Sequence, residues 1–169
     1  YKRLDSLQAE LIDLLDLESK SGDLLENAKG ADVLLGVSAA GAFTKEVLES
    51  LADDAIVFAM ANPNPEATYD EMKAAGVRVA GTGRSDAPNQ INNVAVFPGV
   101  FRGALDVNAS EINDEMKLAA ADALANLIPD EELADDNIAV SVFDPRVAPA
   151  VAKAVADTAV KMGVARKHK

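Results

Sequence analysis

Apolar residues follow two alternating patterns along the chain, one typical of buried strands and one typical of helices. Short runs of consecutive apolar and small residues predict strands covered on both faces, at 31–37, 55–61 and 77–81. Apolar positions three and four residues apart predict helices at about 4–17, 23–29, 44–51, 68–75, 101–107, 113–128 and 145–162. Because strands and helices alternate, we expect an α/β fold: a Rossmann-like parallel sheet with right-handed crossovers and helices on both faces.

The expected helix boundaries depend on a few capping residues. Thr44 and Asn113 stand where an N-cap side chain would accept from the first turn, and Gly163 stands where the last helix would end. Asp144 followed by Pro145 is expected to begin that last helix. The stretch 94–97 is interpreted as a short apolar segment that ends in Pro98-Gly99, before a helix from Phe101 to Val107.

The composition and net charge of the chain argue against several classes of partner and chemistry. The 169 residues suffice for one domain, and 16 basic against 28 acidic residues give a net charge of −12. Such an acidic chain is not expected to bind nucleic acid or an anionic membrane. Cysteine is absent, which excludes disulfides and thiol catalysis, and no apolar run approaches the length of a membrane span, so we expect a cytoplasmic protein.

Small and amide-bearing residues follow each predicted strand. They are Gly36-Val37-Ser38, then Asn62-Pro63, then Gly81-Thr82-Gly83. Ligands of open parallel sheets bind outside the carboxyl ends of the strands, and these residue types let a ligand approach the backbone closely. Any one of these loops could be an ordinary turn, but three in succession favour a binding site.

Two further asparagines, Asn92 and Asn93, close the polar loop after the third strand. Both side chains could reach a pocket from a loop or a helix start, or they could simply cap a helix, and the pattern leaves both interpretations open. Gly81-Thr82-Gly83 lacks the third glycine of the dinucleotide phosphate motif. The only histidine, His168, stands in the basic tail, so histidine acid–base chemistry and a histidine metal site are not expected.

Several stretches together resemble one family. They are Ala31 to Ser38, Phe58 to Glu66, Gly81-Thr82-Gly83-Arg84-Ser85-Asp86, Pro88 to Asn93, Phe97-Pro98-Gly99, Phe101 to Asp106, Glu115 to Ala121 and Asp144-Pro145-Arg146. They resemble the NAD(P)-binding domain of bacterial malic enzymes. The resemblance implies oxidative decarboxylation of L-malate to pyruvate and carbon dioxide, with reduction of NAD or NADP and assistance from Mg²⁺ or Mn²⁺.

The resemblance also implies roles for particular residues. Asn62 would contact the substrate and the nicotinamide side of the cofactor. Asn92 and Asn93 would lie beside the malate carboxylate and the cofactor. The Gly36-Val37-Ser38 stretch would lie along the cofactor. We expect these groups to converge at one rim of the sheet.

Other parts of the family pattern have no counterpart here. The glycine-rich phosphate turn, the catalytic tyrosine and lysine, and the metal-binding carboxylates would all precede residue 1. Tyr1 and Tyr69 do not stand in matching positions.

We therefore expect residues 1–169 to be a partial NAD(P)-binding domain, with the first nucleotide-binding half absent and no activity alone. The expected partners are L-malate, the remainder of the polypeptide covering an exposed part of the sheet, and further copies in a homo-oligomer. The alternative is a noncatalytic binding or interaction module that reuses a half-Rossmann fold.

Overall fold

The computed structural model describes residues 6–15 and 21–166. Its elements, in chain order, are α1 (Ser6–Leu15), α2 (Leu24–Ala28), β1 (Val33–Gly36), α3 (Lys45–Glu49), β2 (Ile56–Ala59), α4 (Tyr69–Ala74), β3 (Val79–Thr82), the 3₁₀ turn η1 (Asn93–Ala95), α5 (Phe97–Asp106), α6 (Asp114–Ala125), the 3₁₀ turn η2 (Asp130–Glu132) and α7 (Val147–Lys161). The expected outer ends of the first helix and His168 lie outside the described residues. The predicted alternation of strands and helices is confirmed, with most elements a few residues shorter than expected.

The three strands form a parallel sheet in the order β1-β2-β3, as predicted. Gly36 pairs with Ala59, and Ala59 pairs with Thr82, so the carboxyl ends of all three strands lie level at one rim. The segment after β3 stays close to this rim, because Gln90 forms a parallel bridge to Thr82. This rim is where ligands of open parallel sheets bind.

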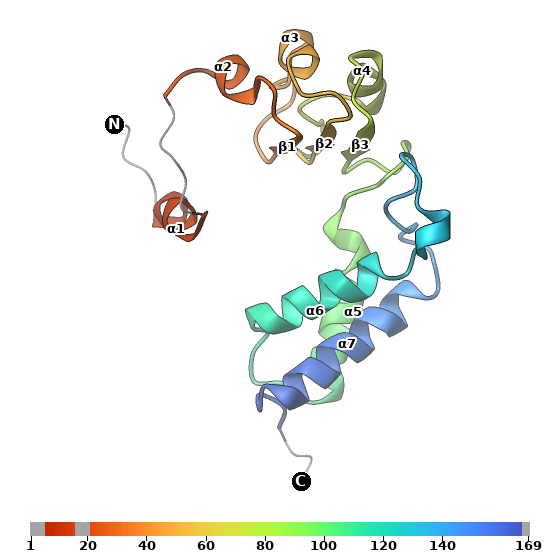
Figure 1. The fold of residues 1–169 in the computed structure, drawn as a ribbon. Helices are drawn as coiled ribbons and strands as arrows, with labels where there is room; N and C mark the ends of the chain where they lie inside the picture. The colour runs from red at the N-terminus through yellow and green to blue at the C-terminus, as the bar shows by residue number, and fades with distance from the viewer. Residues whose placement is uncertain (1–5, 16–20, 167–169) are drawn as a thin grey trace.

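Helices α2, α3 and α4 lie on one side of the sheet (Figure 1). Thr44 caps α3 and Thr68 caps α4, each by accepting from a backbone N–H of the first turn. The core between these helices and the sheet includes Val57 and Ala80, which are fully buried. Residues of β1 that point to the opposite face remain exposed, 51% for Val33 and 58% for Leu35.

Helices α5, α6 and α7 form a separate helical unit with its own core (Figure 1). Gly99 and Gly103 of α5 let α7 approach closely, because a Cβ on Gly99 would come within 2.6 Å of Val151 Cβ. Helix α5 begins at Phe97, four residues before the expected start at Phe101. The interpretation of 94–97 as a separate apolar segment was wrong, because Pro98 stands in the first turn of the helix, where its missing N–H costs nothing.

The start of α7 also differs from the expectation. The helix begins at Val147, and the Asp144 carboxylate accepts from the Arg146 backbone N–H at 2.8 Å within the preceding turn, so it does not cap the helix. The predicted end at Gly163 is confirmed, with a left-handed φ of 74° that suits glycine.

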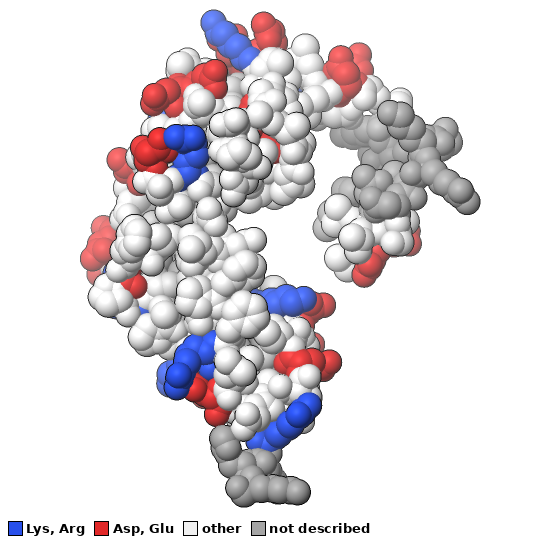
Figure 2. All heavy atoms as spheres, turned by 180° about the vertical axis from the view of Figure 1, so that it is seen from behind, with Lys and Arg blue, Asp and Glu red and all other residues white. Residues whose placement is uncertain are grey.

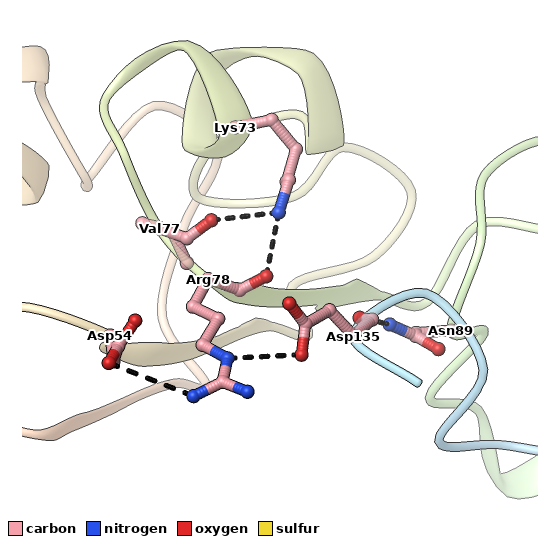
Figure 3. Close-up of polar contacts among 6 residues, drawn as sticks. All are labelled: Asp54, Lys73, Val77, Arg78, Asn89 and Asp135. Carbon is pink, nitrogen blue, oxygen red and sulfur yellow. Dashed lines mark hydrogen bonds and ion pairs between the residues drawn. The ribbon is translucent and has the colours of Figure 1, made fainter. Parts of the chain in front are cut away.

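A polar cluster attaches the connection that precedes α7 to the sheet (Figure 3). The Asn89 amide nitrogen donates to the Ala80 and Asp135 carbonyls at 3.0 and 2.9 Å, and its oxygen accepts from Ile138 N–H at 2.9 Å. Beside it the Arg78 guanidinium lies between Asp135 at 3.1 Å and Asp54 at 3.7 Å. Asn89 therefore joins β3 directly to the segment that leads into the helical unit.

Charged side chains are distributed unevenly over the surface. In the view from behind, Asp, Glu, Lys and Arg lie mainly along the periphery, and uncharged side chains fill the middle of the face (Figure 2). Across the part of the chain that the structure describes, no helix combines the length and apolar character needed to cross a membrane.

Candidate functional site

Two adjoining cavities open at the carboxyl ends of the strands. They measure about 370 and 550 Å³, and four residues line both of them: Asn62, Gly83, Gln90 and Asn92. The larger cavity is also lined by Val37, by Asn93 and by Leu124 of α6, so it lies between the sheet and the helical unit. The structure thus brings Asn62, Asn92 and Asn93 to one place.

Asn62 lies just beyond the end of β2, between Ala61 and a cis-linked Pro63. Its side chain is exposed, and none of the described residues provides it with a hydrogen-bond partner. Its amide can therefore both donate to and accept from a ligand without breaking a bond within the protein.

Asn92 and Asn93 differ in the hydrogen bonds that their side chains make. The Asn92 oxygen accepts from Val94 N–H at 3.0 Å, and its amide nitrogen donates to the Gly83 carbonyl at 3.0 Å. Asn92 is thus an N-cap residue, as one of the two interpretations held, although it still lines both cavities. Asn93 is exposed, and its side chain makes no hydrogen bond within the described ranges.

The stretch after β1 contributes unequally to these cavities. Val37 is 83% exposed and lines the larger one. Ser38 instead directs both its backbone N–H and its hydroxyl to the Glu66 carboxylate, at 2.6 and 3.1 Å. Gly36 is buried, and its missing side chain leaves room for the same carboxylate.

Glu66 is the main feature of this rim that the sequence did not reveal. Its side chain is fully buried, and its second oxygen accepts from Ala61 N–H at 3.0 Å. Burial raises the pKa of Glu66, but the hydrogen bonds from Ser38 and Ala61 outweigh burial and hold the pKa below its ordinary value. The carboxylate is therefore charged at neutral pH.

The cavity walls carry few charges. Arg84 and Asp86 are the charged residues that line them, and the Arg84 Nε–H donates to Asp86 at 2.8 Å. This hydrogen bond lowers the pKa of Asp86. Among the residues that the structure describes, the walls include no His, Lys or Tyr, so this lining can orient a ligand through amides and backbone groups but offers no general acid or base that titrates near neutral pH.

Metal binding finds no support in the described residues. Within the ranges that the structure describes, no group of three or more His, Asp or Glu side chains is arranged to hold a metal ion.

Comparison with known proteins identifies a family. A family model described as "Malic enzyme, NAD binding domain" matches residues 13–160. The chain is 53% identical to the bifunctional malic/malolactic enzyme of Bacillus subtilis over 163 residues, which cover 96% of this chain and 40% of that protein. It is 51% identical to the NAD-dependent malic enzyme of Geobacillus stearothermophilus, with 94% of this chain and 33% of that protein covered.

Solved structures agree with the sequence comparison. The malic enzyme of Pyrococcus horikoshii superimposes with a TM-score of 0.79 at 47% identity, covering 88% of this chain and 34% of that one. The malic enzyme of Entamoeba histolytica gives a TM-score of 0.83 at 41% identity, covering 89% and 31%. The chain therefore spans two fifths or less of the length of these relatives.

Proposed function

Because the chain belongs to the malic enzyme family, we propose that it is part of an enzyme that oxidatively decarboxylates L-malate to pyruvate and carbon dioxide while reducing NAD or NADP. The observation that carries this proposal is the family match over residues 13–160, a stretch that contains every residue of the two cavities at the strand ends.

The cavity at the rim suits the proposed ligands. Its volume of about 550 Å³ falls within the range of small-molecule sites. Malate and the nicotinamide carboxamide present oxygen acceptors together with hydroxyl and N–H donors, and amides match both kinds of group. Asn62, Asn92 and Asn93 would contact malate, and Asn62 with residues 36–38 would lie along the cofactor.

Neutral amides suit a dianionic substrate in a chain of net charge −12. They form hydrogen bonds to malate without adding like charge beside it. The cofactor supplies the hydride acceptor, and the described residues bind and orient the reactants.

The proposal assigns the chemical steps to the rest of the polypeptide. In this proposal the catalytic tyrosine and lysine and the ligands of Mg²⁺ or Mn²⁺ come from outside this chain. Among the described residues, the cavity walls hold no acid or base that titrates near neutral pH, and no group is arranged to hold a metal ion. The exposed face of β1, with Val33 and Leu35, is the surface on which that remainder would pack. The assembled enzyme would be a cytoplasmic homo-oligomer.

The test compares the 169-residue chain with the full polypeptide that contains it. Each is supplied with L-malate, Mn²⁺, and NAD or NADP, and the reduced cofactor is followed by its absorbance. The full polypeptide should turn over, and the chain alone should not. A full polypeptide that binds neither cofactor and forms no reduced product would favour the noncatalytic binding module instead.

A further inference from the structure

Glu66 joins the ends of two neighbouring strands through a single side chain. Ser38 follows β1 by two residues, and Ala61 follows β2 by two residues. One carboxylate oxygen accepts from the Ser38 N–H and hydroxyl, and the other accepts from Ala61 N–H, at 2.6, 3.1 and 3.0 Å. The backbone ladder between β1 and β2 has ended at this point, so the carboxylate continues the connection between them.

The surroundings of Glu66 are built around its carboxylate. A Cβ on Gly36 would come within 2.6 Å of Glu66 Cδ and within 2.8 Å of its Oε1, so residue 36 must be glycine for the side chain to fit. The Glu66 backbone carbonyl accepts from Phe43 N–H at 3.1 Å, so residue 66 also holds the far end of the loop that follows β1. A fully buried carboxylate without a salt-bridge partner among the described residues needs such donors to remain charged.

Glu66 does not line either cavity at the rim, but the residues beside its partners do. Val37 precedes Ser38 and lines the larger cavity, and Asn62 follows Ala61 and lines both. The backbone positions of Val37 and Asn62 thus depend on the two N–H groups that the carboxylate holds.

We infer that Glu66 is a positioning residue for the cofactor site: its carboxylate fixes the loop after β1 relative to the loop after β2, and so sets the distance between Val37 and Asn62. This inference rests on the proposed dinucleotide function. A neutral glutamine would present one oxygen and one N–H₂ group, so it could accept from Ser38 or from Ala61 but would oppose the N–H of the other.

The test uses the full polypeptide and measures cofactor binding apart from turnover. Glu66→Gln is compared with Glu71→Gln, a matched control five residues away. The Glu71 carboxylate also accepts from a backbone N–H and a hydroxyl, both of Thr68 at 2.8 and 2.7 Å, but it only closes the capping box of α4. Binding of NADH and NADPH is titrated by fluorescence, and the melting temperature and the KM for the cofactor are measured on the same samples.

Glu66→Gln should raise the Kd and KM for the cofactor about tenfold, the effect of losing one charge-assisted hydrogen bond. Glu71→Gln should lower the melting temperature but leave the Kd within about twofold of the parent. The inference would be overturned if the Kd for the cofactor were unchanged in Glu66→Gln, or if Glu71→Gln raised this Kd equally. Either result would mean that Glu66 has a purely structural role.

Two further outcomes are also decisive. If Glu66→Gln does not fold, Glu66→Asp takes its place under the same criteria, because it keeps the charge and is too short to reach both strand ends. If the parent polypeptide itself binds neither NADH nor NADPH, the proposed function fails before any variant is compared.

Discussion

Replacing Asn89 with alanine should destabilise the protein more than the loss of any other amide side chain that the structure describes. Asn89 is only 4% exposed, and it makes three hydrogen bonds to backbone groups of two separate segments. Its backbone is left-handed, with a φ of 56°, a conformation that asparagine tolerates better than alanine. The loss of these hydrogen bonds and the left-handed backbone should therefore both lower the stability of the alanine variant.

The structure allows the magnitude to be worked out. The Ala80 carbonyl is buried and would lose the Asn89 donor, which costs about 1–3 kcal/mol. The partner groups of Asp135 and Ile138 lie in a partly exposed connection, where water replaces the amide, so they add about 1 kcal/mol together. Placing alanine in the left-handed region adds about 1–2 kcal/mol, giving about 3–6 kcal/mol in total.

Urea unfolding followed by circular dichroism measures the total change in the free energy of unfolding. Two companion variants separate the contribution of the lost contacts from that of the backbone conformation. Asn89→Gly removes the same contacts without the conformational cost, so it should be about 1–2 kcal/mol less destabilising than Asn89→Ala. Asn64→Ala, at an exposed position with no hydrogen bond to the described residues, should change stability by less than about 0.5 kcal/mol. Amide hydrogen exchange at Ile138 should accelerate in both Asn89 variants, because its N–H loses the Asn89 oxygen.

A loss below about 1 kcal/mol for Asn89→Ala, with exchange at Ile138 unchanged, would refute this reasoning. It would mean that the connection before α7 is held by other contacts.

Four further predictions address the site, the packing, the exposed face and the pH dependence. In the full polypeptide, Asn93→Ala should reduce kcat or raise the KM for malate by about 1–3 kcal/mol in free-energy terms, and steady-state kinetics equal to the parent would contradict its assignment. Gly103→Ala should destabilise the helical unit by about 1–3 kcal/mol in urea unfolding because its Cβ meets the α7 backbone, whereas Gly83→Ala, with no atom closer than 3.7 Å, should not. The isolated chain should self-associate in sedimentation, and Leu35→Lys should weaken that association, whereas a monodisperse parent monomer would count against the apolar face as a packing surface. The fold holds the pKa of Glu66 below its ordinary value of 4.5, so the ionised carboxylate stabilises the folded protein. This stabilisation should be complete above pH 4.5 and be lost as the pH falls through the lowered pKa. In urea unfolding at a series of pH values, Glu66→Gln should lack this acid-dependent loss of stability.

Local signals explain what the sequence could predict. Strands β1 and β2 were found because short apolar runs between turn residues are typical of buried parallel strands. The starts of α3 and α6 were found because Thr44 and Asn113 cap by side-chain contacts within their own turns. Signals of this kind span three or four residues and can be read without knowledge of the fold.

The early start of α5 was missed because its cause lies in another helix. Pro98 and Gly99 look like a turn in sequence. In the structure Gly99 packs against Val151 of α7, and burial of this close contact outweighs the low helix propensity of glycine. The partner is about fifty residues away along the chain, so no local pattern reveals it.

The geometry of the candidate site was predicted only in part, again because some of its contacts join residues far apart along the chain. The convergence of Asn62 with Asn92 and Asn93 follows from topology, because carboxyl ends of parallel strands share a rim. Glu66 was overlooked because it stands in a loop beside Pro65, and its contact with Ser38 joins residues 28 positions apart. A buried carboxylate in a loop leaves no periodic pattern in the sequence. Its sequence correlate is Gly36, whose missing side chain makes room for the carboxylate.

The larger cavity lies where the sheet and the helical unit, each with its own core, are joined. Val37 and Met60 reach it from the sheet, and Leu124 reaches it from α6 of the helical unit, so a ligand there would touch both cores. The sheet and the helical unit have separate buried clusters, and Asn89 fixes the connection between them. Glu66 fixes the two sheet loops on one side of the cavity, and Asn89 fixes the helical side. Under the proposed function, recognition at this rim would depend on two buried polar side chains, Glu66 and Asn89, which hold the walls of the cavity without lining it.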